Sequence, residues 1–384
     1  KTSFTEQKNA ISSGYTAYTF GGYETDTDAH DKATNGLDGI VDGATLSFGG
    51  SGDDVVQGTA SGAYAGYVKL ETSANNAVAT GNKLHINGSV AFQNTGAHAV
   101  GGWAVHKGNG TATAQGNEVH INANASTATT KGNATINGQI IGAWASSLNG
   151  AAALDNIVEI NGSGATAKMA LQDSVFGGLA AAEDKAKSGT FRAQGNQLTI
   201  TDASLTKSGS LIMGGYVNAS GSNASTVNDF NAANNIVTLN NVTVSGSSTK
   251  SNTVAANYAD AQRASLTINS VTANGTEGQT SLTIHGGDYT YTDAIGGYAA
   301  VSGGSGIEVS ANFNSVAMDK GATITSGGVY GARIISNSSD KVTITGSNNS
   351  ISIAANDAKT IKNHTHNNVY GSFVSGAFGT NGSG

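Results

Sequence analysis

The chain has 384 residues, of which 12% are charged, with a net charge of −7, 54 glycines and neither proline nor cysteine. The negative charge disfavours nucleic acid and anionic membranes as partners, because both need a basic patch. The lack of cysteine excludes a disulfide framework. No composition shift marks a domain boundary, so we expect one elongated domain over residues 1–384 with a flexible end at 379–384.

A strand in which two small residues precede an aromatic residue recurs along the chain, as in Val100-Gly101-Gly102-Trp103. Aligned on the Trp103 position, its copies fall at Tyr23, Tyr67, Trp103, Trp144, Leu179, Tyr216, Asn257, Tyr298, Arg333 and Phe373. The steps between neighbouring copies average about 39 residues, and a period kept through the whole chain is the signature of a repeat architecture.

A second strand, of the type Asn-x-Leu/Val-x-Ile, alternates with the first. It begins at Asn82, Asn117, Asn156, Asn196 and Asn235, with weaker copies at Leu46/Phe48, Leu282/Ile284, Val316/Met318 after Asn314 and Ile351/Ile353 after Asn349. Period-2 spacing puts the Asn and the apolar residues on a buried face. The outer face then carries the variable residues His85, His120, Glu159, Thr199 and Thr238. Stacked copies predict apolar core columns beside a corner ladder of hydrogen-bonded Asn amides.

Half of the 39-residue period suits one coil of a β-solenoid with two or three short strands, which predicts two coils per sequence repeat. About 20 coils at about 4.8 Å each would give a rod about 95 Å long. Helix is disfavoured by recurrent glycine and β-branched residues, apart from one possible helical turn, placed in a loop, at residues 180–187. An extra strand near Leu266 predicts an irregular coil or loop over residues 257–281.

The glycine strand contributes columns of its own to the stack. Val100 and its equivalents, three positions before the aromatic residue, share a strand face with Gly102 and its equivalents. We assign these two columns to the interior and the aromatic column to the outside, over a groove left by Gly101 and its equivalents. Asn257 and Arg333 in the aromatic column favour exposure, since neither suits a thin core unpaired.

The aromatic column has two interpretations. The rings shield strand edges and glycine backbone, or they form a broken ladder, about 10 Å apart, that stacks on sugars or anchors a protein partner. The candidate binding residues are Tyr23, Tyr67, Trp103, Trp144, Tyr216, Tyr298 and Phe373.

Two groups of residues are weak candidates for metal ligands. The acidic cluster of Glu24, Asp26, Asp28 and Asp31 beside His30 suits Ca²⁺ in charge, but its spacing lacks the features of an EF-hand, and a solvated acidic edge fits better. His364 and His366 lack further ligands nearby, and His85 and His120, one repeat apart, are interpreted as surface histidines that stack near each other. We expect no cofactor.

Catalysis is disfavoured by the placement of the acidic residues. A β-helix enzyme acting on polysaccharides needs two or three carboxylates that converge in adjacent coils. The mid-chain acids fall in different columns and loops; they are Asp155, Glu159, Asp173, Glu183 and Asp184.

The alternation of Asn-x-Val-x-Ile strands with hydrophobic-Gly-Gly-Tyr strands, without cysteine or proline, resembles the passenger of a monomeric-type (type V) bacterial autotransporter. That resemblance covers nearly the whole chain and implies a right-handed parallel β-helix displayed on the bacterial surface, commonly as an adhesin. It also implies outer-membrane attachment through a C-terminal β-barrel. Neither that barrel nor a signal peptide is in the sequence, so we expect a passenger fragment.

The expected function is therefore extracellular adhesion without catalysis, through an extended face of the β-helix. The expected partner is a host or bacterial surface protein or glycan, or another copy of the chain. The alternative is a structural module that self-associates into aggregates or surface fibres, and a polysaccharide-processing enzyme ranks third.

Overall fold

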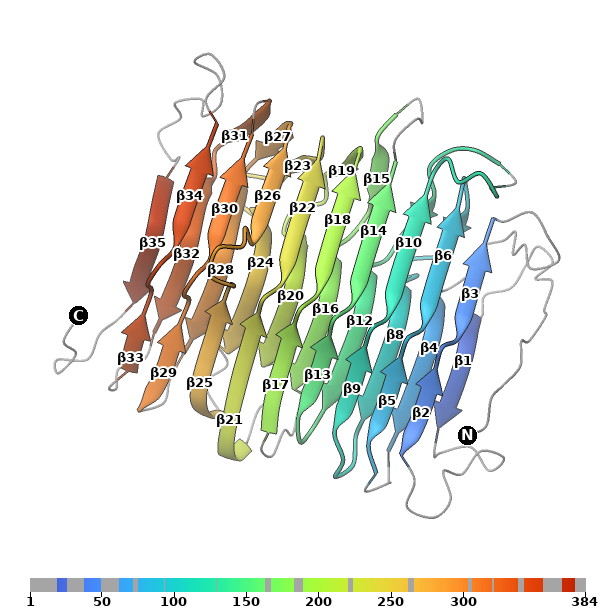
Figure 1. Cartoon of the computed structure of the whole chain (residues 1–384), viewed down its shortest axis with the longest axis horizontal. Helices are drawn as coiled ribbons and strands as arrows, with labels where there is room; N and C mark the ends of the chain where they lie inside the picture. The colour runs from blue at the N-terminus through green and yellow to red at the C-terminus, as the bar shows by residue number, and fades with distance from the viewer. Residues whose placement is uncertain are drawn as a thin grey trace.

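The computed structural model describes residues 19–25, 38–49, 62–71, 75–92, 94–128, 130–162, 167–182, 189–219, 224–261, 266–302, 306–319, 321–337, 342–354 and 368–376. Within these ranges the chain is all β, with no helix, and its strands form four parallel sheets. The sheets wind into a β-solenoid, with successive turns running across Figure 1 from β1 to β35.

A complete turn of the solenoid contributes one strand to each sheet, and we name the sheets A to D in the order in which the chain visits them. Sheet A contains β1 (Thr19–Thr25), β4 (Ala63–Leu70), β8 (Ala99–His106), β12 (Ile140–Ser147), β16 (Val175–Ala182), β20 (Leu211–Ala219), β24 (Asn252–Ala261), β28 (Thr292–Val301), β32 (Gly328–Ser336) and β35 (Asn368–Gly376). Sheet B contains β2 (Gly39–Asp42), β5 (Ala77–Thr80), β9 (Ala112–Gln115), β13 (Ala151–Leu154), β17 (Gly189–Gln194), β21 (Ala224–Ala233), β25 (Leu266–Asn274), β29 (Ile307–Ser310) and β33 (Val342–Thr345).

Sheet C follows sheet B after a tight corner. It contains β3 (Thr45–Phe48), β6 (Lys83–Asn87), β10 (Glu118–Asn122), β14 (Ile157–Asn161), β18 (Gln197–Thr201), β22 (Ile236–Asn240), β26 (Leu282–His285), β30 (Ser315–Met318) and β34 (Ser350–Ile353). Sheet D consists of short strands: β7 (Ala91–Phe92), β11 (Thr135–Ile136), β15 (Met169–Leu171), β19 (Ala203–Leu205), β23 (Thr243–Ser245), β27 (Gly287–Thr290) and β31 (Ala322–Thr325).

One sequence repeat makes one turn, so the prediction of two coils per repeat, about 20 in all, is wrong. Trp103 in β8 pairs directly with Trp144 in β12, one repeat later. Within the described residues, seven turns carry all four strands, as the seven-stranded sheet D shows. The ten strands of sheet A span about 43 Å at 4.8 Å per strand, less than half of the expected length. The two strand types that are evident in the sequence belong to sheets A and C, and the strands of sheets B and D use the rest of each repeat.

Sheet A forms one wall of the solenoid, and sheets B and C together form the other. In Figure 1 the strands of B and C rise on the near side while those of sheet A descend behind them. Buried side chains fill the space between the walls in two clusters. One lies among sheets C, D and the first half of each sheet A strand, and the second lies between sheet B and the remaining half.

The predicted Asn ladder runs between these two clusters, at the corner that joins sheet B to sheet C. Asn156 is typical: its Nδ2 donates to Asn196 Oδ1 at 2.8 Å and to Ala114 O at 3.2 Å. Its Oδ1 accepts from the backbone N and the Nδ2 of Asn117. The residue before each Asn has a positive φ, as at Gly116 (62°) and Asp155 (54°), which makes the corner sharp. The prediction of the ladder is confirmed.

Asn257 corrects the predicted register of the aromatic column. It pairs with Gly215 and Gly297, so Tyr258, and not Asn257, occupies the aromatic position of β24. The Asn257 side chain is fully buried, accepts a hydrogen bond from Asn235 Nδ2 at 2.9 Å and donates one to Asn314 Oδ1 at 3.0 Å. The expectation that this residue is exposed is wrong, because it completes the Asn ladder from the opposite wall.

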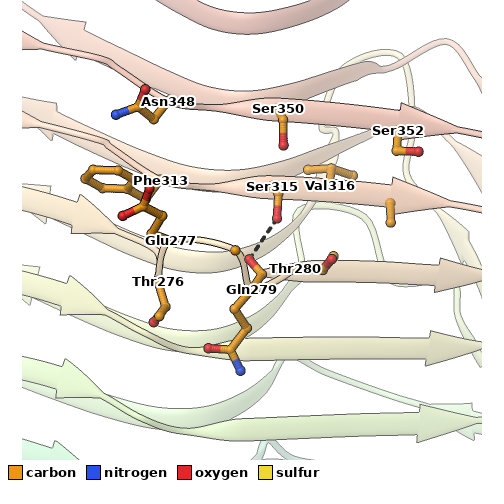
Figure 2. A pocket seen from close by; sticks show the side chains of 12 residues that line it. Thr276, Glu277, Gln279, Thr280, Phe313, Ser315, Val316, Asn348, Ser350 and Ser352 are labelled. Carbon is orange, nitrogen blue, oxygen red and sulfur yellow. Dashed lines mark hydrogen bonds between the residues drawn. The ribbon is translucent and has the colours of Figure 1, made fainter.

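The corner between β25 and β26 explains why the ladder needs Asn257. Two residues form this corner in the turns from β2 to β22, whereas seven residues, 275–281, lie between β25 and β26. This loop has no Asn to place in the ladder, and it lies over the outer side of β30 (Figure 2). The extra strand expected near Leu266 forms the start of β25, whose pairing with β21 shifts register.

The two glycines of the repeated strand both point into the solenoid. A Cβ on Gly102 would lie 2.3 Å from the Asn117 side chain, and one on Gly101 would lie 2.9 Å from Glu118 O, on the opposite wall. Two consecutive inward residues reverse the alternation of the strand, so Val100 points outward and packs in a cluster with Trp103. The small interior column is confirmed; the assignments of Val100 to the interior and of Gly101 to an outer groove are wrong.

Two further expectations concern local structure. Ala180 to Ala182 belong to strand β16, not to a helical turn, and residues 183–187 lie outside the described ranges. The end at 379–384 also lies outside them.

Candidate binding surface

The outer side of sheet A carries a continuous apolar stripe, which we call the outer aromatic face. Two columns form it: the aromatic column, and the residues three positions before it, such as Tyr64, Val100 and Ile141. It comprises Phe20, Tyr23, Tyr64, Tyr67, Val100, Trp103, Ile141, Trp144, Phe176, Leu179, Met213, Tyr216, Ala255, Tyr258, Ile295, Tyr298, Tyr330 and Phe373, with Leu211, Ala300 and Ile335 packed beside them. The stripe runs along most of the solenoid.

The rings of this face stack from turn to turn, at the spacing of neighbouring strands. Ring centroids are 5.4 Å apart for Tyr23 and Tyr67, and the interplanar angle is 7°. Trp103 and Trp144 stack at 4.5 Å, also with an angle of 7°. The ladder is therefore about twice as dense as the predicted spacing of about 10 Å, because one repeat makes one turn.

A second stack follows after an interruption at Leu179. Tyr216 contacts Tyr258 edge-on at 5.3 Å, and Tyr258 stacks on Tyr298 at 4.2 Å. Burial raises the pKa of the Tyr258 hydroxyl, as does the neighbouring Tyr298, so the hydroxyl stays neutral at physiological pH. Tyr258 is absent from the aromatic column assigned from the sequence, which has Asn257 in its place. Asn257 itself indicated the shift, because an asparagine suits the column of small residues no worse than the column of rings.

These rings shield the strand and also face solvent. Val100, Ile141 and Met213 have no exposed surface because the rings cover them, as the shielding interpretation expects. Trp103 and Trp144 themselves are partly exposed. Their Nε1 atoms are buried and have no hydrogen-bond partner, which is unusual for indole groups at a partly wet position.

The aromatic column ends in a charged pair followed by a ring. Arg333 takes the aromatic position in β32, where its Nη1 donates to Asp293 Oδ2 at 2.8 Å and its guanidinium lies over the Tyr330 ring. Phe373 follows in β35 and contacts the edge of Tyr330. The face therefore presents rings, one compensated ion pair and few other charges, which suits a largely uncharged partner surface.

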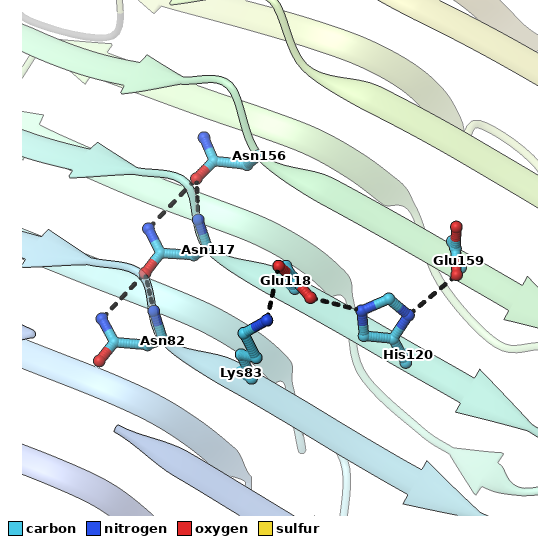
Figure 3. Close-up of polar contacts among 7 residues, drawn as sticks. All are labelled: Asn82, Lys83, Asn117, Glu118, His120, Asn156 and Glu159. Atoms are coloured by element: carbon cyan, nitrogen blue, oxygen red, sulfur yellow. Dashed lines mark hydrogen bonds and ion pairs between the residues drawn. The ribbon is translucent and has the colours of Figure 1, made fainter. Parts of the chain in front are cut away.

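The outer side of sheet C carries a different group, made of charged side chains from three turns (Figure 3). His120 lies between two carboxylates: its Nε2 is 2.8 Å from Glu118 Oε2 and its Nδ1 is 2.9 Å from Glu159 Oε2. A carboxylate only accepts hydrogen bonds, so both contacts are donated together only by the protonated imidazolium. Lys83 Nζ completes the group, 3.0 Å from Glu118 Oε1.

The charges of this group shift the pKa values of its members. Burial raises the pKa of Glu118, but hydrogen bonds from His120 and Lys83 outweigh it and leave the pKa lowered. Burial, followed by the nearby His120, lowers the pKa of His85. The rings of His85 and His120 stack at 5.2 Å, which confirms that they lie near each other. Both carboxylates have partners, Lys83 and His120 for Glu118 and His120 for Glu159, so the group suits structural ties between turns.

The other polar candidates are dispersed or lie outside the described residues. Asp155 is at a corner and accepts from Gln115, while Asp173 pairs with Lys207. Glu24 Oε2 accepts a hydrogen bond from the backbone N of Ile40. The described ranges do not include Asp26, Asp28, His30, Asp31, Glu183, Asp184, His364 or His366. Among the residues that are described, no group of three or more His, Asp or Glu side chains is arranged to hold a metal ion.

Comparison of the chain with models of protein families, with curated proteins and with solved structures finds no match. Over the described ranges, no helix has the length and apolar character required to cross a membrane.

Proposed function

We propose that the chain is the binding region of a bacterial cell-surface adhesin, a passenger of the monomeric autotransporter type, which attaches through its outer aromatic face. The observation that carries this proposal is the stack of partly exposed rings that extends across consecutive turns of sheet A. The proposal includes an extracellular location, outer-membrane attachment through a β-barrel, and right-handed winding, the hand that parallel connections favour.

The physical basis for binding is the rigid repetition of aromatic side chains. Tyr and Trp supply large contact areas with little loss of side-chain entropy, and they dominate the energetics of many interfaces. On a solenoid each ring is fixed by its neighbours, at a spacing of about 4.8 Å. A partner with several sites therefore makes several contacts at once, and modest contacts add up to firm attachment.

The partner that suits this face is a protein or glycan on a host or bacterial surface. Sugars offer apolar ring faces that stack on aromatic side chains, and protein partners offer apolar anchors. The only ion pair that we place on the face, Arg333 with Asp293, is internally compensated, so steering by charge contributes little. The proposed activity is binding, with no covalent chemistry.

Replacement of both Trp103 and Trp144 by leucine tests the proposal. Leucine already occupies this column at Leu179, where it is well packed, so the variant retains cover over Val100 and Ile141. We expect binding of the purified chain to cultured host cells and to bacteria to weaken by about tenfold or more, because central aromatic residues contribute about 2 kcal/mol or more each. Flow cytometry with labelled chain measures it.

The matched control removes a stacked pair from the other wall. Replacement of His85 and His120 by alanine also takes away two rings one turn apart, but on sheet C, and we expect binding to stay within about twofold, a difference of about 0.4 kcal/mol. Unchanged binding by a folded leucine variant would remove the outer aromatic face from consideration.

Self-association is the alternative, and the end of sheet A favours it. Val369, Tyr370 and Val374 on β35 are 47%, 38% and 43% exposed, the largest apolar exposures on that sheet among the described residues. Exposed apolar strands promote pairing between chains. Sedimentation of the purified chain distinguishes the two functions, because an adhesin for foreign surfaces stays monomeric in solution whereas a self-associating module shows concentration-dependent assembly.

A further inference from the structure

The loop of residues 275–281 forms a hollow on the outer side of sheet C. The loop is fastened to the following turn, where Ser315 Oγ donates to the backbone oxygen of Gln279 at 3.0 Å and Gly275 N donates to Asn312 O at 2.8 Å. The space between the loop and strands β30 and β34 has a volume of about 310 Å³, at the lower end of the range for small-molecule sites.

Hydroxyl and amide groups dominate the wall of this hollow (Figure 2). Ser315 and Ser350 are paired across β30 and β34, and Ser352 lies two residues further along. Thr280 adds a hydroxyl from the loop, whereas the Gln279 side chain extends away from the three serines, and Asn348 lies at the end of the hollow that holds the Phe313 ring. Glu277 is the one ionisable side chain in the lining.

Phe313 contributes the only aromatic ring of the lining, from a backbone conformation that rarely holds such a residue. Its φ is 56°, in the left-handed region, where a bulky side chain is an outlier. At the same corner, other turns place Gly81, Gly116 or Asn348, residues that tolerate this region. The ring is partly exposed at the hollow and is not part of the buried core. Strain of this kind clusters at functional sites.

We propose that this hollow is a binding site for a neutral saccharide. The Phe313 ring offers a flat apolar surface for the C–H face of a sugar, and the serine, threonine and amide groups match its hydroxyls. The lining has no cation, so a sialylated or sulfated sugar would find no partner for its negative charge. The site is on sheet C, on the wall opposite to sheet A, and therefore does not depend on the outer aromatic face.

The test uses the full chain and a panel of immobilised oligosaccharides that end in glucose, galactose, mannose, N-acetylglucosamine or fucose, beside matched sialylated and sulfated ones. We expect binding to at least one neutral glycan. Phe313→Gly is expected to weaken that binding tenfold or more while the thermal midpoint is unchanged or higher, since glycine relieves the strained φ. Ser350→Ala is a second variant with the same expected loss, and it keeps the backbone pairing of β34 with β30.

Two matched variants complete the design. His85→Ala with His120→Ala, on sheet C outside the hollow, is expected to keep neutral-glycan binding within twofold. Phe313→Gly is also measured together with Trp103→Leu and Trp144→Leu, so that glycans held by the outer aromatic face do not obscure the loss. Three results would each overturn the inference: no neutral glycan bound at millimolar concentration, binding restricted to acidic glycans, or neutral-glycan binding that survives both Phe313→Gly and Ser350→Ala.

Discussion

Asn156→Ala is expected to lower the free energy of unfolding by about 3 kcal/mol or more, the sum of several unsatisfied buried groups at about 1–3 kcal/mol each. The substitution removes the acceptor of the backbone N and Nδ2 of Asn117, and the donor to Ala114 O. All of these groups are at a buried corner, away from solvent. Urea unfolding followed by tryptophan fluorescence measures the loss, because Trp103 and Trp144 lie in the same turns as Asn117 and Asn156.

Asn87→Ala is the matched control for this prediction. Asn87 is at the outward end of strand β6, where its side chain is partly exposed. We expect a change within about 0.5 kcal/mol, as for surface substitutions in general. If Asn87→Ala and Asn156→Ala lowered the free energy of unfolding equally, the ladder position of Asn156 would add nothing to the contribution of an ordinary surface asparagine.

Asn257→Gly is the second prediction with a large effect, because glycine is the residue that neighbouring turns carry at this position. Gly215 and Gly297 flank Asn257 in sheet A, so the repeat pattern by itself would suggest a neutral change. We expect instead a loss of about 3 kcal/mol, since the ladder is cut between Asn235 and Asn314 and leaves buried donors and an acceptor without partners. Thermal and urea unfolding of the purified variant measure this loss.

Ala143→Gly provides the comparison. Ala143 occupies the same column of sheet A as Asn257, but in a turn whose corner between sheets B and C carries an Asn of its own. Asn156 fills the ladder there, so the expected cost is that of backbone entropy alone, about 0.5–1 kcal/mol. A similar small loss for Asn257→Gly would contradict the role of Asn257 as the missing member of the ladder.

The parts of the fold that the sequence predicts well are those with strict period-2 alternation and distinctive residues. Asn82, Leu84 and Ile86 are all fully buried, and His85 between them faces outward, as the pattern requires. Sheet B gives little signal in the sequence, because its strands are four to six residues long in most turns and rich in alanine, as in Ala112 and Ala114. Alanine is compatible with helix, strand and loop, so it gives little signal.

The glycine strand was harder to interpret because its alternation changes phase in the middle. Gly101 and Gly102 both point inward, and nothing in a single sequence marks where two successive residues share a side. This change of phase turns the Val100 side chain to the outer side of the strand, where the aromatic rings cover it. The outward direction of Trp103 was nevertheless correct, since that residue lies after the phase change.

The hollow under residues 275–281 could not be predicted, although one signal was present. Phe313 immediately precedes Asn314, where the other copies of the corner carry Gly, Asp or Asn. Phenylalanine at this position marks a turn whose corner takes a left-handed conformation with a residue that does not favour it. What the sequence could not reveal is that a loop from the preceding turn lies over the same place, because that contact depends on the stacking of the turns.

Every column of the solenoid and both proposed sites depend on one repeat making one turn. Thr199 in β18 and Thr238 in β22 are directly paired on the outer side of sheet C, and the native chain has no cysteine. With Thr199→Cys and Thr238→Cys, we expect oxidation to close an intramolecular disulfide, because paired Cα atoms lie about 5 Å apart. Thr199→Cys with Thr283→Cys, two turns apart, is expected to keep both thiols free. Free thiols in the first variant, after oxidation of the folded chain, would contradict the one-turn repeat.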